Sequence, residues 1–157
     1  MTTTGVRRID VPPSVRALST LPRVDYCDAF LFDAGPNRDE SAEDLVREVL
    51  EGAARAVRAQ LQSGWTAIGL KVSSGSQGSV LGWSIRRSLP DQVLLGAESR
   101  IGMPGELLLK KEGGAMLFAT FVSQQNLLAR AVWAVTEPVH VRVVRDLLAE
   151  ASRRLMT

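Results

Sequence analysis

The fold is decided by residues 80–123, which read VLGWSIRRSLPDQVLLGAESRIGMPGELLLKKEGGAMLFATFVS. Three pairs of turn-forming residues divide this segment: Pro90-Asp91, Pro104-Gly105 and Gly113-Gly114. Proline presets φ for the first central position of a turn and glycine supplies a positive φ, so each pair favours a chain reversal. The segment therefore predicts four strands joined by three turns.

The first two of these strands alternate apolar and polar residues, as in Leu81, Trp83 and Ile85 beside Ser84 and Arg86. Successive side chains of a strand point to opposite faces, so each strand has one dry face and one wet face. Short alternating runs between turns favour an antiparallel meander. We expect this sheet to be covered on one side only.

The last two strands have a less regular pattern. Three leucines run together at 107–109, and both faces of residues 115–122 are apolar. In the latter strand either of two sets could face the interior, namely Met116, Phe118 and Val122 or Leu117 and Phe121.

After Ser123 the apolar period changes to the three-and-four spacing of a helix. The stripe comprises Leu128, Ala131, Val132, Val135, Val139, His140, Val144, Leu147, Leu148, Ala151 and Leu155. Pro138 lacks an N–H and clashes with the preceding turn, so we expect a kink or a split near Thr136. A helix of this length with one apolar stripe is predicted to lie across the sheet.

The part before residue 80 predicts a strand over 23–33, with Tyr26, Asp28 and Phe30 on one face. Two short helices follow, the first capped by Ser41 with Asp44 three residues on, and they are separated near Gly52. Residues 65–72 could continue the helix or form a strand. Residues 1–22 are expected to be a partly mobile lead-in, 73–79 a flexible loop, and 23–157 a single domain.

Composition narrows the class of protein. The net charge of the 157 residues is +2, which gives no indication of a nucleic-acid partner. A single cysteine excludes an intramolecular disulfide and a cysteine-rich metal site, and it fits a reducing cytoplasm. No apolar run reaches the length of a membrane span, and we find no signal peptide. We therefore expect a cytoplasmic protein with no membrane span.

Three stretches are similar to a known superfamily: VDYCDAF at 24–30, Leu94-Leu95-Gly96, and the tail with NLLAR at 126–130, Trp133 and EPVH at 137–140. They resemble the helix-grip superfamily of START and Bet-v-like proteins (SRPBCC), and most closely an uncharacterised bacterial subfamily. The resemblance implies an α+β fold in which a curved antiparallel sheet wraps around a long C-terminal helix. It also implies a hydrophobic cavity between them. Members of the superfamily bind lipids, sterols or polyketides, and some cyclise or hydrolyse their ligand.

The residues expected to line such a cavity come from the first strand, the meander and the long helix. They are Tyr26, Asp28, Phe30, Trp83, Phe118, Phe121, Trp133, Thr136 and His140. Asp28 would need an arginine or hydroxyl partner if it points inward, because burying an unpartnered carboxylate is costly. The alternative is that the strand leaves the core at this position.

His140 is the only histidine, and it could act as an acid or base in the cavity. No partner carboxylate is evident from its neighbours along the chain, so a packed histidine is favoured. Cys27 is interpreted as a small buried residue. We predict no catalytic residue, no metal site and no cofactor.

The sequence thus favours a binder of a hydrophobic small molecule of lipid or polyketide type. An interaction module, such as a homodimer without a ligand, is the second hypothesis. An enzyme of cyclase or hydrolase type that uses the cavity is the third.

Overall fold

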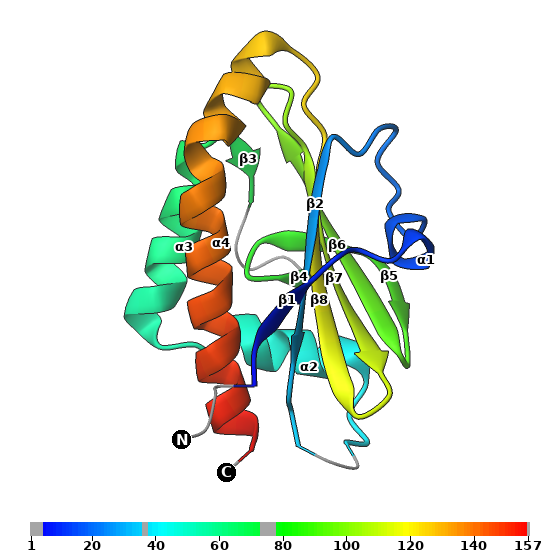
Figure 1. Ribbon diagram of the computed structural model, residues 1–157. Helices are drawn as coiled ribbons and strands as arrows, with labels where there is room; N and C mark the ends of the chain where they lie inside the picture. The colour runs from blue at the N-terminus through cyan, green and yellow to red at the C-terminus, as the bar shows by residue number, and fades with distance from the viewer. Residues whose placement is uncertain (1–4, 36–37, 73–77, 157) are drawn as a thin grey trace.

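The computed structural model describes residues 5–35, 38–72 and 78–156 and has an α+β architecture. The order of the elements is β1 (Arg7–Ile9), α1 (Pro13–Arg16), β2 (Tyr26–Phe32), α2 (Ala42–Leu50), α3 (Arg55–Ala67), β3 (Leu70–Lys71), β4 (Ser79–Val80), β5 (Trp83–Leu89), β6 (Gln92–Ser99), β7 (Gly105–Glu112), β8 (Ala115–Val122) and α4 (Leu127–Leu155). Figure 1 shows the sheet on one side, α4 and α3 on the other, and α2 across the lower end.

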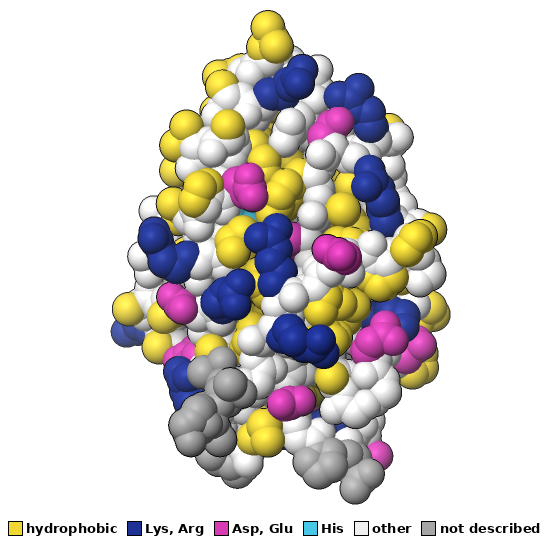
Figure 2. Space-filling view, viewed as in Figure 1, with side chains coloured by type: hydrophobic (Ala, Val, Ile, Leu, Met, Phe, Trp, Pro, Cys, Tyr) yellow, Lys and Arg dark blue, Asp and Glu magenta, His cyan; other side chains and the backbone are white. Residues whose placement is uncertain are grey.

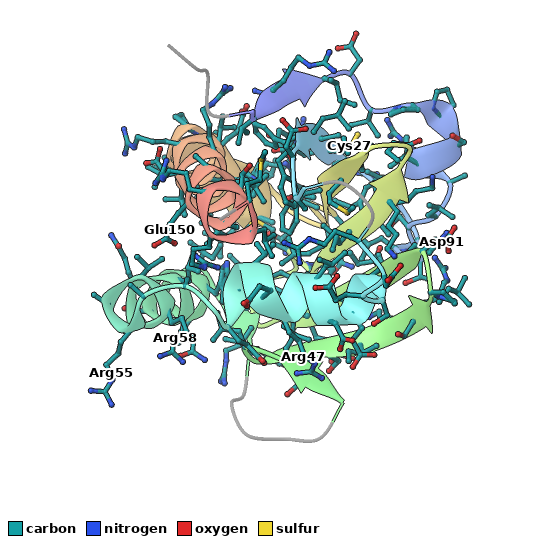
Figure 3. All side chains as sticks on the ribbon, turned by 90° about the horizontal axis from the view of Figure 1, so that it is seen from below. Cys27, Arg47, Arg55, Arg58, Asp91 and Glu150 are labelled. Carbon is teal, nitrogen blue, oxygen red and sulfur yellow. The ribbon has the colours of Figure 1, made fainter. Side chains whose placement is uncertain are left out.

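The predicted meander is confirmed, because β5, β6, β7 and β8 pair in sequence and antiparallel. β2 joins it beside β8, and the sheet runs in the order β1-β2-β8-β7-β6-β5-β4, with β3 paired to β6 off this path. Seen from below, the strands curve around α2 and α4 (Figure 3). We call the face toward these helices the concave face.

Both faces of residues 115–122 are buried in the structure, so each of the two alternating sets packs in a core cluster. Met116 and Phe118 pack on the concave side with α2 and α4, and Leu117 and Phe121 pack on the opposite, convex side. The expectation that the sheet is covered on one side only is therefore wrong. The three leucines at 107–109 have the same explanation, since a strand buried on both faces has no polar alternation.

The cover on the convex face is the N-terminal segment, which we expected to be a lead-in. β1 pairs with β2, and Val15 of α1 lies in the convex cluster with Leu94, Leu108 and Phe121. The expectations of mobility at the N-terminus and in the 73–79 loop fall largely on residues 1–4 and 73–77, which lie outside the described residues.

The two predicted short helices are present. Ser41 caps α2 by accepting a hydrogen bond from the backbone N–H of Asp44 (3.1 Å), and α2 packs across β4–β7. The ambiguous residues 65–72 belong to both kinds of element, because residues 65–67 complete α3 and Leu70 begins the strand β3. Gly69 makes the change of direction at a positive φ of 92°.

α4 runs without a break from Leu127 to Leu155, so of the two alternatives expected near Thr136, a kink or a split, the split does not occur. Its predicted apolar stripe is buried only in the second half, where Val144, Leu147 and Leu148 pack against the sheet and α2. In the first half Leu128, Val135 and Val139 are exposed, and the helix buries Ala129 and Trp133 instead. Within the described residues we find no helix with the length and apolar character needed to cross a membrane.

Candidate ligand-binding site

A buried carboxylate lies where β2 faces the middle of α4. Asp28 has no exposed side-chain surface, and two groups bind one of its oxygens. The Tyr26 hydroxyl donates to Oδ2 at 2.6 Å, and Nε2 of His140 lies 3.1 Å from the same atom. The structure therefore gives His140 a partner carboxylate that its neighbours along the chain did not reveal, and gives Asp28 the hydroxyl partner that burial requires.

The Tyr26 hydroxyl is held in its protonated form. Burial raises the pKa of Tyr26, and the hydrogen bond to Asp28 and the negative charge of that carboxylate raise this pKa further. The phenol consequently acts as a donor to Oδ2 throughout the neutral range. With two partners on Oδ2, the other oxygen of Asp28 remains available.

Several buried polar atoms around this carboxylate have no hydrogen-bond partner among the described residues. They are Oδ1 of Asp28, Oγ1 of Thr120, Nε1 of Trp133 and Nε1 of Trp83. Thr120 is directly opposite Asp28 in the β2–β8 register. The ring of Trp133 lies 4.9 Å from that of Tyr26 and 5.1 Å from that of His140, centroid to centroid. We call Tyr26, Asp28, Thr120, Trp133 and His140 the Asp28 cluster.

Trp83, on β5, reaches the same lateral row of paired residues from the edge of the sheet opposite β2. In register, Tyr26 pairs with Val122 and Val122 with Gly105, and the ring of Trp83 lies 3.6 Å from where a Cβ on Gly105 would be. The ring therefore occupies the space that glycine leaves. Trp83 also packs edge-on against Trp65 of α3, with centroids 5.4 Å apart.

The remaining residues expected to line the cavity lie on the concave face, on α4 and on the convex face. Phe30 and Phe118 are fully buried on the concave face in the row after Asp28 and Thr120. Thr136 donates to the carbonyl of Val132 (2.7 Å), so its hydroxyl is used within the helix. Phe121 does not share a face with the rest, because it packs on the convex side.

Cys27 also lies on the convex side of β2, where Figure 3 labels it, with the Arg16 guanidinium 3.9 Å from its sulfur. Cys27 is only partly buried, and it packs against the apolar residues of the convex cluster. Thr120 is the member of the cluster that sequence reasoning missed. Its position two residues after Phe118 on an alternating strand was the available signal.

Two surface grooves lie away from the Asp28 cluster. One, of about 660 Å³, runs between β1 and α4 and is lined by Gly5, Val6, Arg7, Arg8, Leu31, Phe32, Asp33, Ala115 and Arg145. The other, of about 510 Å³, lies at the opposite side of Asp33 and includes Arg38, Lys111 and Met116. Neither lining contains a residue of the cluster, and within the described residues no three acidic, histidine or cysteine side chains form a group that could hold a metal.

Comparisons with known proteins assign neither a family nor a function to the chain. No model of a known protein family matches the chain, and a search of curated proteins finds no match. Among solved structures, the crystal structure of CalU16 from Micromonospora echinospora is similar at 12% identity and a TM-score of 0.30, over 96% of this chain and 94% of that one. A likeness at this level does not assign a function, so the functional interpretation depends on the site itself.

Proposed function

We propose that the chain binds a hydrophobic small molecule, of lipid or polyketide type, between the concave face of the sheet and α4. The sheet and the long helix would then act as a helix grip, as the sequence resemblance implies. The polar group of the ligand would lie in the Asp28 cluster. Its apolar part would lie toward Trp83, Phe30 and Phe118.

The observation that carries this proposal is the set of partnerless polar atoms in an otherwise apolar layer. A buried polar group without a hydrogen bond costs about 1–3 kcal/mol, and native proteins keep few of them. Here Asp28 Oδ1, Thr120 Oγ1 and Trp133 Nε1 come from three elements and belong to neighbouring side chains. Together they offer a carboxylate acceptor, a hydroxyl and an N–H donor, which suits a ligand carrying a hydroxyl or a carbonyl.

The first test is mass spectrometry of an organic extract of freshly purified protein. We expect a stoichiometric small molecule in the wild-type extract and its loss or depletion in the Trp133→Phe variant, which keeps a ring but removes the indole N–H. Thr66→Val, an exposed change on α3, serves as the control. Clean extracts from every protein, together with no saturable binding of fatty acids or polyketides in titrations, would contradict the proposal.

Thr120→Val gives a sharper test, because it separates binding from folding. Valine has nearly the shape of threonine but lacks the hydroxyl that has no partner. We expect the ligand-free variant to be more stable by about 1 kcal/mol, since an unsatisfied buried group is removed, and to bind the ligand more weakly. A loss of stability in the ligand-free variant would mean that the hydroxyl is already paired within the fold.

A second candidate function is favoured by the convergence of Tyr26, Asp28 and His140. A carboxylate bonded to an imidazole fixes the orientation of the ring, and such a pair can move a proton to or from a bound molecule. Hydrolysis of activated esters would test a hydrolase. We expect His140→Gln to abolish the rate if this function exists, and equal rates for variant and wild type would exclude it.

The homodimer hypothesis also stays a prediction. The convex face of the sheet is covered by the N-terminal segment, so it offers no exposed sheet face on which two copies could pair. Exposed apolar side chains lie instead on the first half of α4, including Leu127 and Val135. Sizing at low concentration tests this hypothesis, and a strict monomer would exclude it.

A further inference from the structure

The groove between β1 and α4 carries an unusual charge arrangement. Arg7 and Arg8 lie on β1 and Arg145 lies on α4, and all three line the groove together with the single carboxylate of Asp33. Figure 2 shows lysine and arginine side chains gathered on the face where β1 and α4 lie side by side. We call this hollow the β1–α4 groove.

Two of these arginines converge on one aromatic ring. Cζ of Arg145 lies 5.5 Å and Cζ of Arg8 lies 6.0 Å from the ring centroid of Phe30. Phe30 is fully buried, and Arg8 is opposite it in the β1–β2 register. The aromatic ring attracts both cations and holds their stems, so Arg8 of β1 and Arg145 of α4 are each anchored beside the groove.

The convergence leaves like charges without a counter-ion. Within the described residues, no carboxylate lies within ion-pair distance of Arg7, Arg8 or Arg145, and all three side chains are exposed. Adjacent like charges repel each other unless an anion lies between them. With three arginines and one carboxylate in its lining, the hollow has an excess of positive charge, and such a hollow concentrates anions more strongly than a flat surface does.

In the neighbouring groove, by contrast, the cations have hydrogen-bond and ion-pair partners within the protein. There Arg38 donates to the carbonyls of Ala34 and Leu155 and pairs with Glu40 at 2.7 Å, and Lys111 donates to the carbonyl of Arg38 at 3.4 Å. These cations have protein partners and hold the chain in place. Arg8 and Arg145 of the β1–α4 groove contact the ring of Phe30, but among the described residues no hydrogen bond or ion pair engages their guanidinium groups.

From these contacts we propose that the β1–α4 groove binds a small organic anion through a phosphate or carboxylate group. Arg8 and Arg145 supply the guanidinium forks, whose planar geometry matches both kinds of group. The partly exposed apolar residues of the same lining, Val6 and Leu31, lie where the carbon part of the molecule is received. This site is separate from the Asp28 cluster and does not depend on the function proposed for that cluster.

The test is an amide chemical-shift titration at low ionic strength, where surface charges are least screened. The probes are octyl phosphate, inorganic phosphate and octanol. We expect octyl phosphate to saturate and to shift the amides of residues 31–33 and 115. Inorganic phosphate should shift the same amides with lower affinity, and octanol should leave them unchanged.

Three variants locate the site. Arg8→Gln and Arg145→Gln are each expected to weaken octyl phosphate binding by about three- to tenfold, the loss of one charge-assisted contact. Arg142→Gln, an exposed change on the same helix outside the groove, should leave the affinity unchanged. Thermal unfolding of each variant checks that it folds.

Several results would overturn the proposal. They are a failure of octyl phosphate to saturate, the same shifts with octanol, and an Arg142→Gln variant that binds as weakly as Arg145→Gln. Shifts confined to residues 26, 28 and 120 would place the probe in the Asp28 cluster and would also reject an anion site in the groove. Failure of the cavity extraction experiment leaves these outcomes unaffected.

Discussion

Tyr26 is the only tyrosine in the chain, so its ionisation can be followed without interference. Its folded-state pKa is raised above the ordinary value of 10.0, first by burial and then by Asp28. Above pH 10 the unfolded chain therefore loses this proton while the folded chain keeps it. The stability that the protonated hydroxyl contributes is complete below pH 10 and falls as the pH rises further.

We expect the ultraviolet absorbance of tyrosinate to appear near pH 10 in denaturant and only at higher pH in the folded protein. The free energy of unfolding should decline above pH 10 in the wild type and decline less in Tyr26→Phe. Ionisation of the folded protein at the ordinary value would mean that the hydroxyl does not donate to Asp28.

Glu106 is a second buried carboxylate, and its partners come from the N-terminal segment. It is fully buried and accepts from the Ser19 hydroxyl (2.6 Å), from the backbone N–H and hydroxyl of Thr20, and from Arg86 (2.8 Å). Replacing it with glutamine removes the charge opposite Arg86 and places an amide N–H among donors. Glu106→Gln should lower the free energy of unfolding by about 3–5 kcal/mol in chemical denaturation.

The matched control for this change is Glu112→Gln. Glu112 pairs with Lys110 at 3.1 Å, but its side chain is 42% exposed. Surface pairs contribute about 0–1 kcal/mol, so we expect a small effect. Equal losses of unfolding free energy in the two variants would mean that Glu106 does not hold the N-terminal segment against the sheet.

At the scale of the element, α4 continues through Pro138 despite the missing backbone N–H. The carbonyl of Ala134 thereby loses its ordinary helical partner. Pro138→Ala restores that donor, and we expect the midpoint of thermal unfolding to rise, corresponding to about 1–3 kcal/mol. A lower midpoint would show that the proline shapes the helix so that His140 can reach Asp28.

The elements also show which features sequence reasoning can find. The strands β5–β8 were predictable because turn pairs and alternation are local signals. The helix α4 was predictable from its spacing, but its buried half was not, since Leu128 and Val135 fit the same stripe as Val144. Burial there depends on where the sheet and α2 end, which the sequence of the helix does not contain.

The site was harder to predict than the fold, because its contacts join residues that are far apart in the sequence. Tyr26 and Asp28 were assigned to one face correctly, because strand alternation is local. The contact between Asp28 and His140 joins residues 112 positions apart, and the opposition of Asp28 and Thr120 depends on the β2–β8 register. Neither relation leaves a trace in the neighbouring residues.

At the scale of the whole molecule, the described part of the N-terminal segment, residues 5–22, covers the convex face of the sheet instead of leading into the domain. Deleting them would expose the convex cluster, including Leu94, Leu108, Leu117 and Phe121, and would leave Glu106 without two partners. A large exposed apolar patch favours association. We expect the shortened protein to bind a hydrophobic dye strongly and to elute as oligomers in size-exclusion chromatography.

The result that would contradict this expectation is a monomeric shortened protein that unfolds cooperatively. It would mean that residues 23–157 fold alone, as the sequence analysis assumed. The full-length chain at the same concentration is the control.

Along the path from β1 to β4, the two end strands are the shortest, with three residues in β1 and two in β4. Two of the three residues of β1 are exposed arginines. A long, flat outer strand is a template on which another chain can add its own strand, and short, charged ones are a recognised protection. The sheet is therefore poorly suited to growth by strand addition, so that if copies of this chain assemble, they should do so through side chains and not by extending the backbone ladder.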